Sequence, residues 1–507
     1  MEKQYDVIVI GAGNGGLTAA TTVAKAGYRT LLLEKHNIPG GCATSFVRGR
    51  FEFDTSLHGV ASFGRKEEPG SIRKIFDELG VGLDWVADEQ WVRAIIPGKE
   101  GFDVTLSVNR SKYIEAMERA VQGCRESVEK MFELGDSCMK ALRYIGQGKI
   151  DPQVLMTEHQ DFMRCASYTL DEVMEEVGMP EKARNLLSVC WTYLGTPSDK
   201  LKALHYCLML VGYCKNKAYV PTKKSYAISL SLAKSLEMNG GEIWMNSEVV
   251  KLIMDKGKAV GVVLADGRKL FAKQIISNVI PTNVLGKMME KEESSQYARQ
   301  LANARKLAFS SVNLYLGLNR SAEELGIREY SMLIDRTPRS KDQFENIKNI
   351  ETNHYMATCC PNIIIPNASP KGTCMLIITQ NYIEPSWNEI TPENYKKVKE
   401  KVADKILFDF EDITGIQIRD SIEEIEIATP ATFARYLGTP SGTMYGYFSG
   451  GWDSMMHRVL ARKEEEQMIE GVWFCGGHSY KTSGYSSSYE TGYDIGKKVA
   501  QRLKEAE

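Results

Sequence analysis

The chain of 507 residues is long enough for two or three domains around a large core. Its composition is that of an ordinary globular protein, with 43% hydrophobic and 25% charged residues and a net charge of −2. This near-neutral balance gives no reason to expect a nucleic acid as a partner. The 11 cysteines are scattered without a CxxC pair, which argues against a disulfide framework or a metal site and favours reduced thiols in the cytoplasm.

The segment before the first apolar strand, Met1 to Asp6, is short and charged and does not resemble a secretory signal. No apolar run approaches the roughly 18 residues of a membrane span. The most apolar helix candidate, residues 201–213, is interrupted by His205 and Gly212. We expect a buried helix there that lines an apolar pocket, and we expect no transmembrane span, although an apolar ligand leaves peripheral membrane contact open.

Alternating strand and helix patterns run along the chain. The N-terminal part is typical of a strand, a tight turn, an Ala-rich helix and a second strand (residues 7–10, 15–26 and 30–33). A mostly helical stretch follows at 110–215. After it, the pattern predicts a helix at 225–239 and strands at 242–245, 249–254, 259–264 and 275–276, with an Asp266-Gly267 hairpin turn. Residues 305–430 mix strands with a helix near 394–410, and the chain ends in a strand at 472–475 and a helix from about residue 486.

These patterns predict an α/β fold: a Rossmann-type dinucleotide-binding domain with a parallel sheet, and an interleaved substrate domain of mixed sheet and helices. The dinucleotide-type elements recur at the start, middle and end of the chain. We therefore expect three parts of the dinucleotide-binding domain, separated by a helical lid and a substrate domain, with boundaries at 1–109, 110–219 (lid), 220–285, 286–430 (substrate domain) and 431–507.

The first strand leads into Gly11-Ala12-Gly13-Asn14-Gly15-Gly16, a Gly-x-Gly-x-x-Gly motif that opens a helix. Gly11 permits the sharp turn, Gly13 lets a pyrophosphate approach the backbone, and Gly16 allows close helix–sheet packing. The free N–H groups of the helix start then face the phosphates. Glu34, at the end of the second strand, is placed to accept hydrogen bonds from ribose hydroxyls, and its charge disfavours a 2′-phosphate.

Two further segments favour FAD over NAD. Gly40-Gly41-Cys42 follows Glu34 closely, and its paired glycines suit an extended chain alongside the flavin. Cys42 invites comparison with flavin disulfide reductases, but Val47 occupies the position of their second cysteine, which excludes that chemistry. Near the C-terminus, Gly476 and Gly477 follow a strand, and the next helix begins with serines that either cap it or contact the flavin.

Taken with Phe53-Asp54-Thr55-x-x-His58, the Gly-Gly-Cys run resembles the phytoene desaturase and carotenoid isomerase superfamily of FAD oxidoreductases, in particular its retinol saturase branch. Further matches lie at Gly240 to Ile243 with Val249, at Ile276-Ser277-Asn278 and at Ala428-Thr429-Pro430. The resemblance implies a Rossmann-type FAD-binding domain like that of glutathione reductase or the amine oxidases. It also implies action on carbon–carbon double bonds of an apolar, retinoid- or carotenoid-like substrate, by saturation, desaturation or isomerisation. The expected cofactor-binding residues are Gly11, Gly13, Gly16, Glu34, Lys35, Gly40, Gly41, Cys42, Val249, Gly476, Gly477, Ser486 and Ser487.

This sequence departs from the family pattern at three places. Pro221-Thr222-Lys223-Lys224 replaces Pro-x-Gly-Gly, Ser56 replaces a glycine, and His478 to Lys481 replace the usual residues after the C-terminal glycines. The substrate is therefore less well defined than the cofactor.

Saturation of an alkene needs a proton donor beside the hydride source. His478 and Tyr480 follow the C-terminal glycines and His58 follows the early flavin segment, so each is a candidate. We expect the substrate pocket to be apolar and roofed by the helical stretch, through Trp191, Tyr193, Leu194, Tyr206 and Met209.

Two other functions remain open from the sequence. A flavin amine oxidase would need an aromatic cage, for which Tyr445, Tyr447, Trp452 and Tyr485 are available, but Gly477 stands in place of the usual glutamate. A lipid-binding chaperone, like the Rab GDP-dissociation inhibitors, would not need Glu34 or the C-terminal flavin segment. Because the Gly-x-Gly-x-x-Gly motif occurs once, the electron donor is expected to be transiently bound NADH or NADPH, another protein or the substrate itself. The sequence does not define the oligomeric state.

Overall fold

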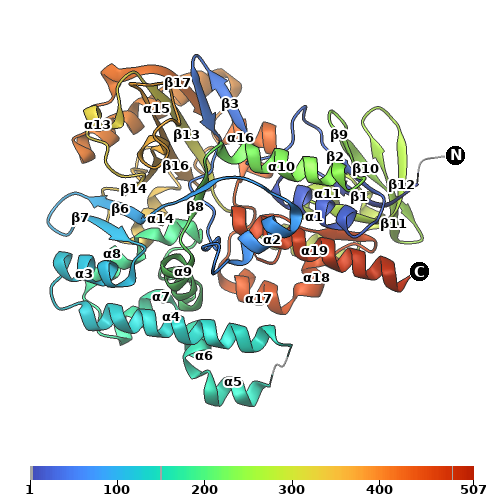
Figure 1. The fold of residues 1–507 in the computed structure, drawn as a ribbon, viewed down its shortest axis with the longest axis horizontal. Helices are drawn as coiled ribbons and strands as arrows, with labels where there is room; N and C mark the ends of the chain where they lie inside the picture. Colours follow the sequence, from blue (N-terminus) through green and yellow to red (C-terminus); the bar gives the residue numbers. More distant parts are fainter. Residues whose placement is uncertain (1–3, 149–150, 482–483) are drawn as a thin grey trace.

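The computed structural model describes residues 4–148, 151–481 and 484–507. Two seven-stranded sheets lie next to each other, and a unit of helices lies against the second one (Figure 1). The predicted α/β class, with a Rossmann-type sheet and an interleaved mixed sheet, is confirmed.

The first sheet has the strand order β10–β11–β12–β1–β2–β9, and β18 pairs with β12. Pairing is parallel from β18 through β12, β1 and β2 to β9, and antiparallel between β10, β11 and β12. The bounds are β1 (Gln4–Ile10), β2 (Thr30–Leu33), β9 (Glu242–Trp244), β10 (Val249–Asp255), β11 (Lys258–Leu264), β12 (Lys269–Ser277) and β18 (Val472–Phe474). The chain therefore returns to this sheet from three distant segments, as the sequence pattern predicts.

Alternate residues of β1 pack on opposite faces of this sheet, as strand geometry requires. Val7 and Val9 belong to the core formed with α1 (Asn14–Lys25), α2 (Ser71–Leu79), α10 (Lys224–Met238) and α19 (Tyr485–Glu505). Ile8 and Ile10 belong to the core on the other face, under α11 (Pro281–Lys287) and α12 (Gln296–Ala304). Burial on both faces explains why β1 is a continuous apolar run.

The second sheet has the order β17–β13–β16–β15–β14–β6–β7, antiparallel except between β14 and β6. Its strands are β6 (Gln90–Ile96), β7 (Phe102–Ser107), β13 (Ser310–Leu318), β14 (Ser331–Ile334), β15 (Met356–Cys359), β16 (Cys374–Tyr382) and β17 (Ile422–Ala428). One face packs on α15 (Pro392–Thr414) through an aliphatic core. Residues 90–107 thus pair in this sheet, although they precede the expected boundary at residue 109.

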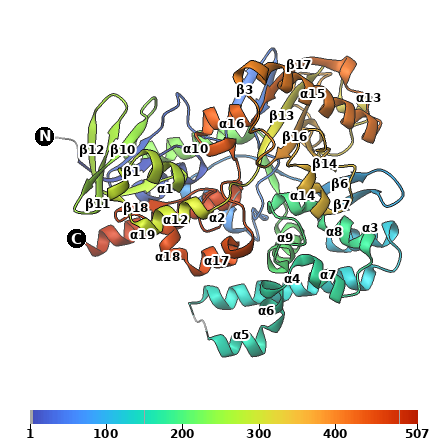
Figure 2. The same cartoon turned by 180° about the vertical axis from the view of Figure 1, so that it is seen from behind.

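The helical unit comprises α3 (Arg110–Ala120), α4 (Arg125–Gly146), α5 (Pro152–Glu158), α6 (Gln160–Ser167), α7 (Leu170–Glu176), α8 (Glu181–Leu187), the 3-10 helix η1 (Ser188–Tyr193) and α9 (Ala203–Asn216). β5 (Trp85–Ala87), which precedes β6 and β7, pairs antiparallel with β8 (Tyr219–Pro221), which follows the helical unit. The chain therefore leaves for β6, β7 and the helical unit and returns from them at one place. Seen from behind, the unit lies beneath the second sheet (Figure 2).

Shorter elements complete the fold. The β3 (Ser45–Arg48) and β4 (Phe51–Asp54) hairpin lies beside β17, joined by the ion pairs Arg48–Glu426 and Arg50–Glu423. The remaining helices are α13 (Ala322–Leu325), α14 (Ser340–Asn346), α16 (Pro430–Leu437), α17 (Met455–Leu460) and α18 (Arg462–Glu466). No helix among the described residues is long and apolar enough to cross a membrane.

Candidate functional site

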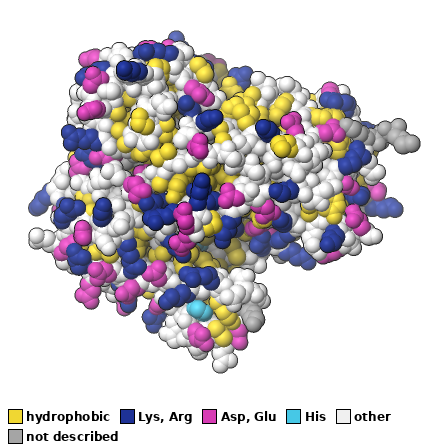
Figure 3. Space-filling view, in the orientation of Figure 1, with side chains coloured by type: hydrophobic (Ala, Val, Ile, Leu, Met, Phe, Trp, Pro, Cys, Tyr) yellow, Lys and Arg dark blue, Asp and Glu magenta, His cyan; other side chains and the backbone are white. Residues whose placement is uncertain are grey.

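One cavity of about 1290 Å³ runs between the first sheet, the second sheet and the helical unit. Its walls include the Gly-rich turn after β1, the carboxyl end of β2, the start of α19, the face of β13, β15 and β16, and the inner side of α9. In the space-filling view, apolar side chains gather over the middle of the molecule between these parts, with charged side chains around them (Figure 3). A site at the carboxyl ends of parallel strands is the usual place for a ligand in such a sheet.

The turn between β1 and α1 needs its glycines. Gly11 has φ +91°, and a Cβ on Gly16 would lie 1.9 Å from the Gly11 carbonyl oxygen. A Cβ on Gly13 would lie 2.7 Å from Nδ2 of Asn278. Gly13 is the N-cap of α1 and no side chain caps the helix, so its first N–H groups are open to an anion such as a pyrophosphate.

Glu34 is buried at the end of β2 and lines the cavity. Its Oε2 accepts a hydrogen bond from the Ala12 N–H at 2.7 Å, and its Oε1 accepts one from the His36 N–H at 2.9 Å. These bonds hold the carboxylate beside the Gly-rich turn, where a ribose would lie. Lys35 and Val249 line the same cavity, and Lys35 Nζ also donates to the Arg435 carbonyl at 3.4 Å.

The segment with Gly40, Gly41 and Cys42 lies directly against this turn. The Gly40 N–H donates to the Ala12 carbonyl at 2.7 Å, and a Cβ on Gly41 would lie 3.2 Å from the Gly13 Cα. Gly40 and Gly41 have φ +125° and +59°, so both need the freedom of glycine. Cys42 lines the cavity, and burial raises the pKa of its thiol to about 11, which makes it an unreactive neighbour of the ligand.

The C-terminal segment meets the same turn from the other side. Gly476 has φ +98°, and a Cβ there would lie 2.2 Å from Oδ1 of Asn278, while Gly477 lines the cavity. The start of α19, including Ser486 and Ser487, also lines the cavity and carries no side-chain cap. Ser486 instead donates to the Ala61 carbonyl at 2.8 Å. Of the two roles left open for these serines, capping of the helix is not observed, so a second open helix N-terminus faces the cavity.

The three proton-donor candidates fall in different places. His478 is buried and lines the cavity, and its Nε2 has no hydrogen-bond partner among the described residues. Burial, helped by Arg305 and Arg458, lowers the pKa of His478 to about 4. His58 also lines the cavity, and burial lowers its pKa to about 4 as well. Both imidazoles are therefore neutral at pH 7.

Tyr480 is not among the residues that line the cavity. Its hydroxyl donates to Asp494 Oδ2 at 2.6 Å, and its ring lies 4.1 Å from the Arg462 guanidinium. The turn after Gly477 carries Tyr480 into the packing between α18 and α19, so the structure gives it no contact with a ligand in the cavity.

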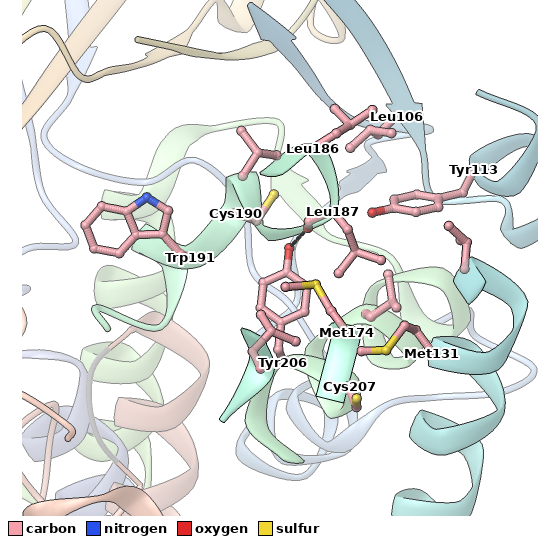
Figure 4. Close-up of a cluster of buried hydrophobic side chains, with 14 of the residues drawn as sticks. Leu106, Tyr113, Met131, Met174, Leu186, Leu187, Cys190, Trp191, Tyr206 and Cys207 are labelled. Carbon is pink, nitrogen blue, oxygen red and sulfur yellow. Dashed lines mark hydrogen bonds between the residues drawn. The ribbon is translucent and has the colours of Figure 1, made fainter. Parts of the chain in front are cut away.

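The helical unit roofs the other end of the cavity, as expected. Tyr193 and Leu194 at the end of η1, and Met209 and Tyr213 on α9, line it. Trp191 and Tyr206 do not, which corrects that part of the expectation. They lie in the core of the helical unit (Figure 4), where the Trp191 indole N–H donates to Gln343 Oε1 and the Tyr206 hydroxyl donates to the Leu187 carbonyl.

Several lining residues were not recognised as site residues from the sequence. Asn278 follows β12 and fills the space between Gly13, Gly15 and Gly476; its place at the carboxyl end of a strand beside β1 was a usable signal. The floor of the roofed end comes from three strand segments, and no local motif marks it: Asn313, Tyr315, Tyr355, Ala357, Thr379 and Asn381. Of the aromatic residues considered for an amine-oxidase cage, Tyr445 and Tyr485 line the cavity, and Tyr447 and Trp452 do not. Within the described residues, no group of three or more His, Cys, Asp or Glu side chains is arranged for a metal ion.

Comparisons with known proteins agree with this architecture. A family model described as an NAD(P)-binding Rossmann-like domain matches residues 9–79. The chain is 26% identical to the chloroplastic prolycopene isomerase of Daucus carota, over 99% of this chain and 81% of that protein. It is 25% identical to the all-trans-retinol 13,14-reductase of Danio rerio, over 88% of this chain and 78% of that protein.

A solved structure, the cyclohexylamine oxidase from Brevibacterium oxydans, has a TM-score of 0.61 and 16% identity, with 99% of this chain and 100% of that one covered. The resemblance drawn from the motifs and the Rossmann-type fold are both confirmed.

Proposed function

We propose that this protein is an FAD-dependent oxidoreductase that acts on carbon–carbon double bonds of an apolar, polyene-like substrate. The observation that carries this proposal is that one continuous cavity joins the Gly-rich turn and Glu34 to a roof of Tyr193, Met209 and Tyr213. Its volume of about 1290 Å³ exceeds the ~300–1,000 Å³ of a site for one drug-sized ligand, so a dinucleotide and a second molecule fit together. The similarity to a prolycopene isomerase and a retinol reductase supports the substrate class.

The residues present fit FAD. Gly11 and Gly16 allow the sharp turn and its close packing, Gly13 would let a pyrophosphate approach the backbone, and Glu34 would face a ribose. The free N–H groups at the start of α19 suit the pyrimidine edge of a flavin, where they stabilise negative charge. FAD, when bound, supplies hydride exchange with the substrate carbon.

The protein's own residues then have defined tasks. The aromatic side chains of η1 and α9 bind the apolar substrate and exclude water from the reacting carbons. His478 and His58, neutral at pH 7, hold or pass a proton through one N–H and one acceptor nitrogen each. Tyr480 has no part in this chemistry because its hydroxyl is engaged with Asp494.

The amine oxidase alternative is less well supported. The fold similarity to cyclohexylamine oxidase, at 16% identity, concerns the architecture alone. Only Tyr445 and Tyr485 of the four candidate cage residues line the cavity, and Gly477 stands where an amine oxidase has glutamate.

We further propose that NADH or NADPH binds transiently as the electron donor, since the fingerprint occurs once in the sequence. The division into five segments and the cytoplasmic location stay predictions.

The function is tested by purifying the protein and recording its visible spectrum. We expect a yellow protein whose flavin, once reduced anaerobically with dithionite or NAD(P)H, is reoxidised by members of a panel of alkenes and polyenes. A colourless protein that does not take up added FAD would refute the cofactor assignment. A flavin that is reduced by primary amines but reoxidised by no alkene would favour the amine oxidase.

A further inference from the structure

A second, much smaller cavity of about 50 Å³ lies behind His58. Four residues line both cavities: His58, Gly59, Tyr193 and Tyr213. The rest of its lining comes from Asp88, Gln90, Trp91, Val108, Ala218, Tyr330 and Ser331. His58 therefore stands in the wall between the substrate space and a recess that contains a carboxylic acid.

The recess is built for water or another small hydrogen-bonding group. The buried Nε1 of Trp91 has no hydrogen-bond partner among the described residues, although buried donors are nearly always paired. A volume of about 50 Å³ holds on the order of three waters, since each needs roughly 10–15 Å³ of such space. The ring of Trp91 stacks on that of Tyr213 with centroids 4.7 Å apart, which fixes the indole beside the recess.

Asp88 is the carboxylic acid that lines this recess together with His58. It is 7% exposed, and its Oδ1 accepts a hydrogen bond from the Gln90 N–H at 3.1 Å. Its backbone N–H donates to the Ala218 carbonyl at 3.0 Å, which fixes its main chain beside the recess. The next residue, Glu89, is exposed, so the chain reaches solvent one residue beyond Asp88.

We propose that Asp88 is the proton reservoir of the reaction and that it feeds the substrate through the small cavity and His58. This inference rests on the proposed function. In the saturating direction the Asp88 carboxyl group gives its proton to a water in the recess. That water protonates the near nitrogen of His58, whose other nitrogen gives its proton to the substrate carbon that carries the electron pair. Asp88 then regains a proton from solvent.

The charged and titratable groups around Asp88 favour this role. Burial, opposed by the hydrogen bond from the Gln90 N–H and assisted by the charge of the neighbouring Glu89, raises the pKa of Asp88 to about 7. Glu89 is itself paired with Lys217 at 2.6 Å. The other titratable groups that line the recess or interact with Asp88 come from five segments of the chain and are ordinarily uncharged at this pH: His58, Tyr193, Tyr213, Tyr330 and Cys359. An acid that is half protonated near neutral pH is well matched to proton delivery.

His58 is placed to pass the proton on without becoming charged. Its backbone carbonyl accepts a hydrogen bond from the Tyr330 hydroxyl at 2.7 Å, which anchors the residue. Its ring makes no hydrogen bond to any other described residue, and the residue lines both cavities. A neutral imidazole has one donor and one acceptor nitrogen, which is what a relay needs.

The test is Asp88→Asn in the flavin-loaded enzyme, with Asp335→Asn as the matched control. Asp335 is also buried, at 3% exposure; burial raises its pKa to about 7, and it accepts backbone N–H bonds, but it lines neither cavity. In the wild type, substrate-driven flavin reoxidation should fall as pH rises through about 7, because the donor must be protonated. Asp88→Asn should slow that step by about tenfold or more and abolish the decline, while Asp335→Asn keeps both rate and profile.

A readout independent of turnover is the infrared difference spectrum of the protein between about pH 5 and about pH 9. Asp88→Asn should remove one protonated-carboxyl band that titrates near neutral pH, and Asp335→Asn a different one. His58→Gln should slow the same step and keep the Asp88 band. If Asp88→Asn destabilises the fold, His58→Gln still tests the relay through the rate of the same step and its pH profile.

Failure of the relay is distinguishable from failure of the function. A wild-type flavin that no alkene or polyene reoxidises overturns both. An active wild type with an Asp88→Asn variant that matches Asp335→Asn, or an Asp88 band already absent near pH 5, overturns the relay alone.

Discussion

The helix α1 that carries the Gly-rich turn crosses α19 at a backbone-to-backbone contact, and this contact makes a sharp prediction. A Cβ on Gly492 of α19 would lie 2.2 Å from the Gly15 carbonyl oxygen and 3.0 Å from its Cα. To restore an ordinary separation of about 3.5 Å, the helices must move apart by roughly 1 Å. Overpacking of this kind costs about 1–3 kcal/mol, whereas the Gly-to-Ala change gains about 0.8–1.0 kcal/mol of helix propensity.

Gly286 on α11 is a matched control, because a Cβ there meets nothing within 4 Å. Gly286→Ala should therefore keep or raise the melting temperature, and Gly492→Ala should lower it. Both variants gain helix propensity, so the difference between their free energies of unfolding gives the cost of the contact at Gly492, about 1–3 kcal/mol. Since α1 moves with the Gly-rich turn, Gly492→Ala should also weaken FAD binding by about tenfold, or 1.4 kcal/mol, in a flavin titration. Equal stability and equal FAD affinity of the two variants would refute the close approach.

Three further outcomes are expected. Glu34→Ala should weaken FAD binding by about 1.5–3 kcal/mol, roughly 10- to 150-fold, and an unchanged dissociation constant would show that Glu34 does not bind the ribose. Tyr480→Phe should cost about 1 kcal/mol of stability by removing the bond to Asp494 and change turnover no more than a few-fold; a large loss of turnover at full FAD content would restore Tyr480 as a catalytic candidate. Alkylation of Cys42, followed by mass spectrometry, should be slow at neutral pH and rise with pH toward about 11, so rapid labelling near pH 7 would contradict the raised pKa of its thiol.

The elements that sequence patterns predicted well are those with strong local signals. β2 was predicted with the bounds that the structure has, and α1 begins one residue earlier than expected. The Gly-x-Gly-x-x-Gly turn and Glu34 share one βαβ unit, so local spacing alone defines their positions. The end of the cavity at the Gly-rich turn and Glu34, the dinucleotide end, could therefore be predicted from the sequence.

Long-range pairing was not accessible in the same way. β6 pairs in parallel with β14, and Arg93 lies beside Met332 across more than two hundred residues of chain. The local sequence of β6 does not indicate that its partner is β14, because the same apolar residues would be buried in either of the two sheets. The polar floor of the roofed end has the same origin: Asn313, Thr379 and Ala357 become neighbours only through the register of three strands.

Position along a helix or a turn also decided which aromatic residues reach the cavity. Tyr206 and Tyr213 both lie on α9, but seven residues at 1.5 Å each separate them by about 10 Å along the helix. That distance puts Tyr213 in the wall of both cavities and Tyr206 in the core of the helical unit. The composition of the helical unit predicts an apolar roof, but the position of each residue along its helix decides which aromatic side chains line the cavity.

The same geometry explains why the cofactor is better defined by this chain than the substrate. The dinucleotide end is built from backbone: glycines at contact distance, two open helix starts and one buried carboxylate, none of which tolerates much variation. The roofed end is built from side chains of η1, α9 and three strands of the second sheet. A shared cofactor end with a different substrate end agrees with relatives at about 25% identity of which one is named an isomerase and one a reductase. In this chain the wall at His58 is where the small cavity adjoins the roofed end, so this wall is the place where proton delivery to the substrate can be tested.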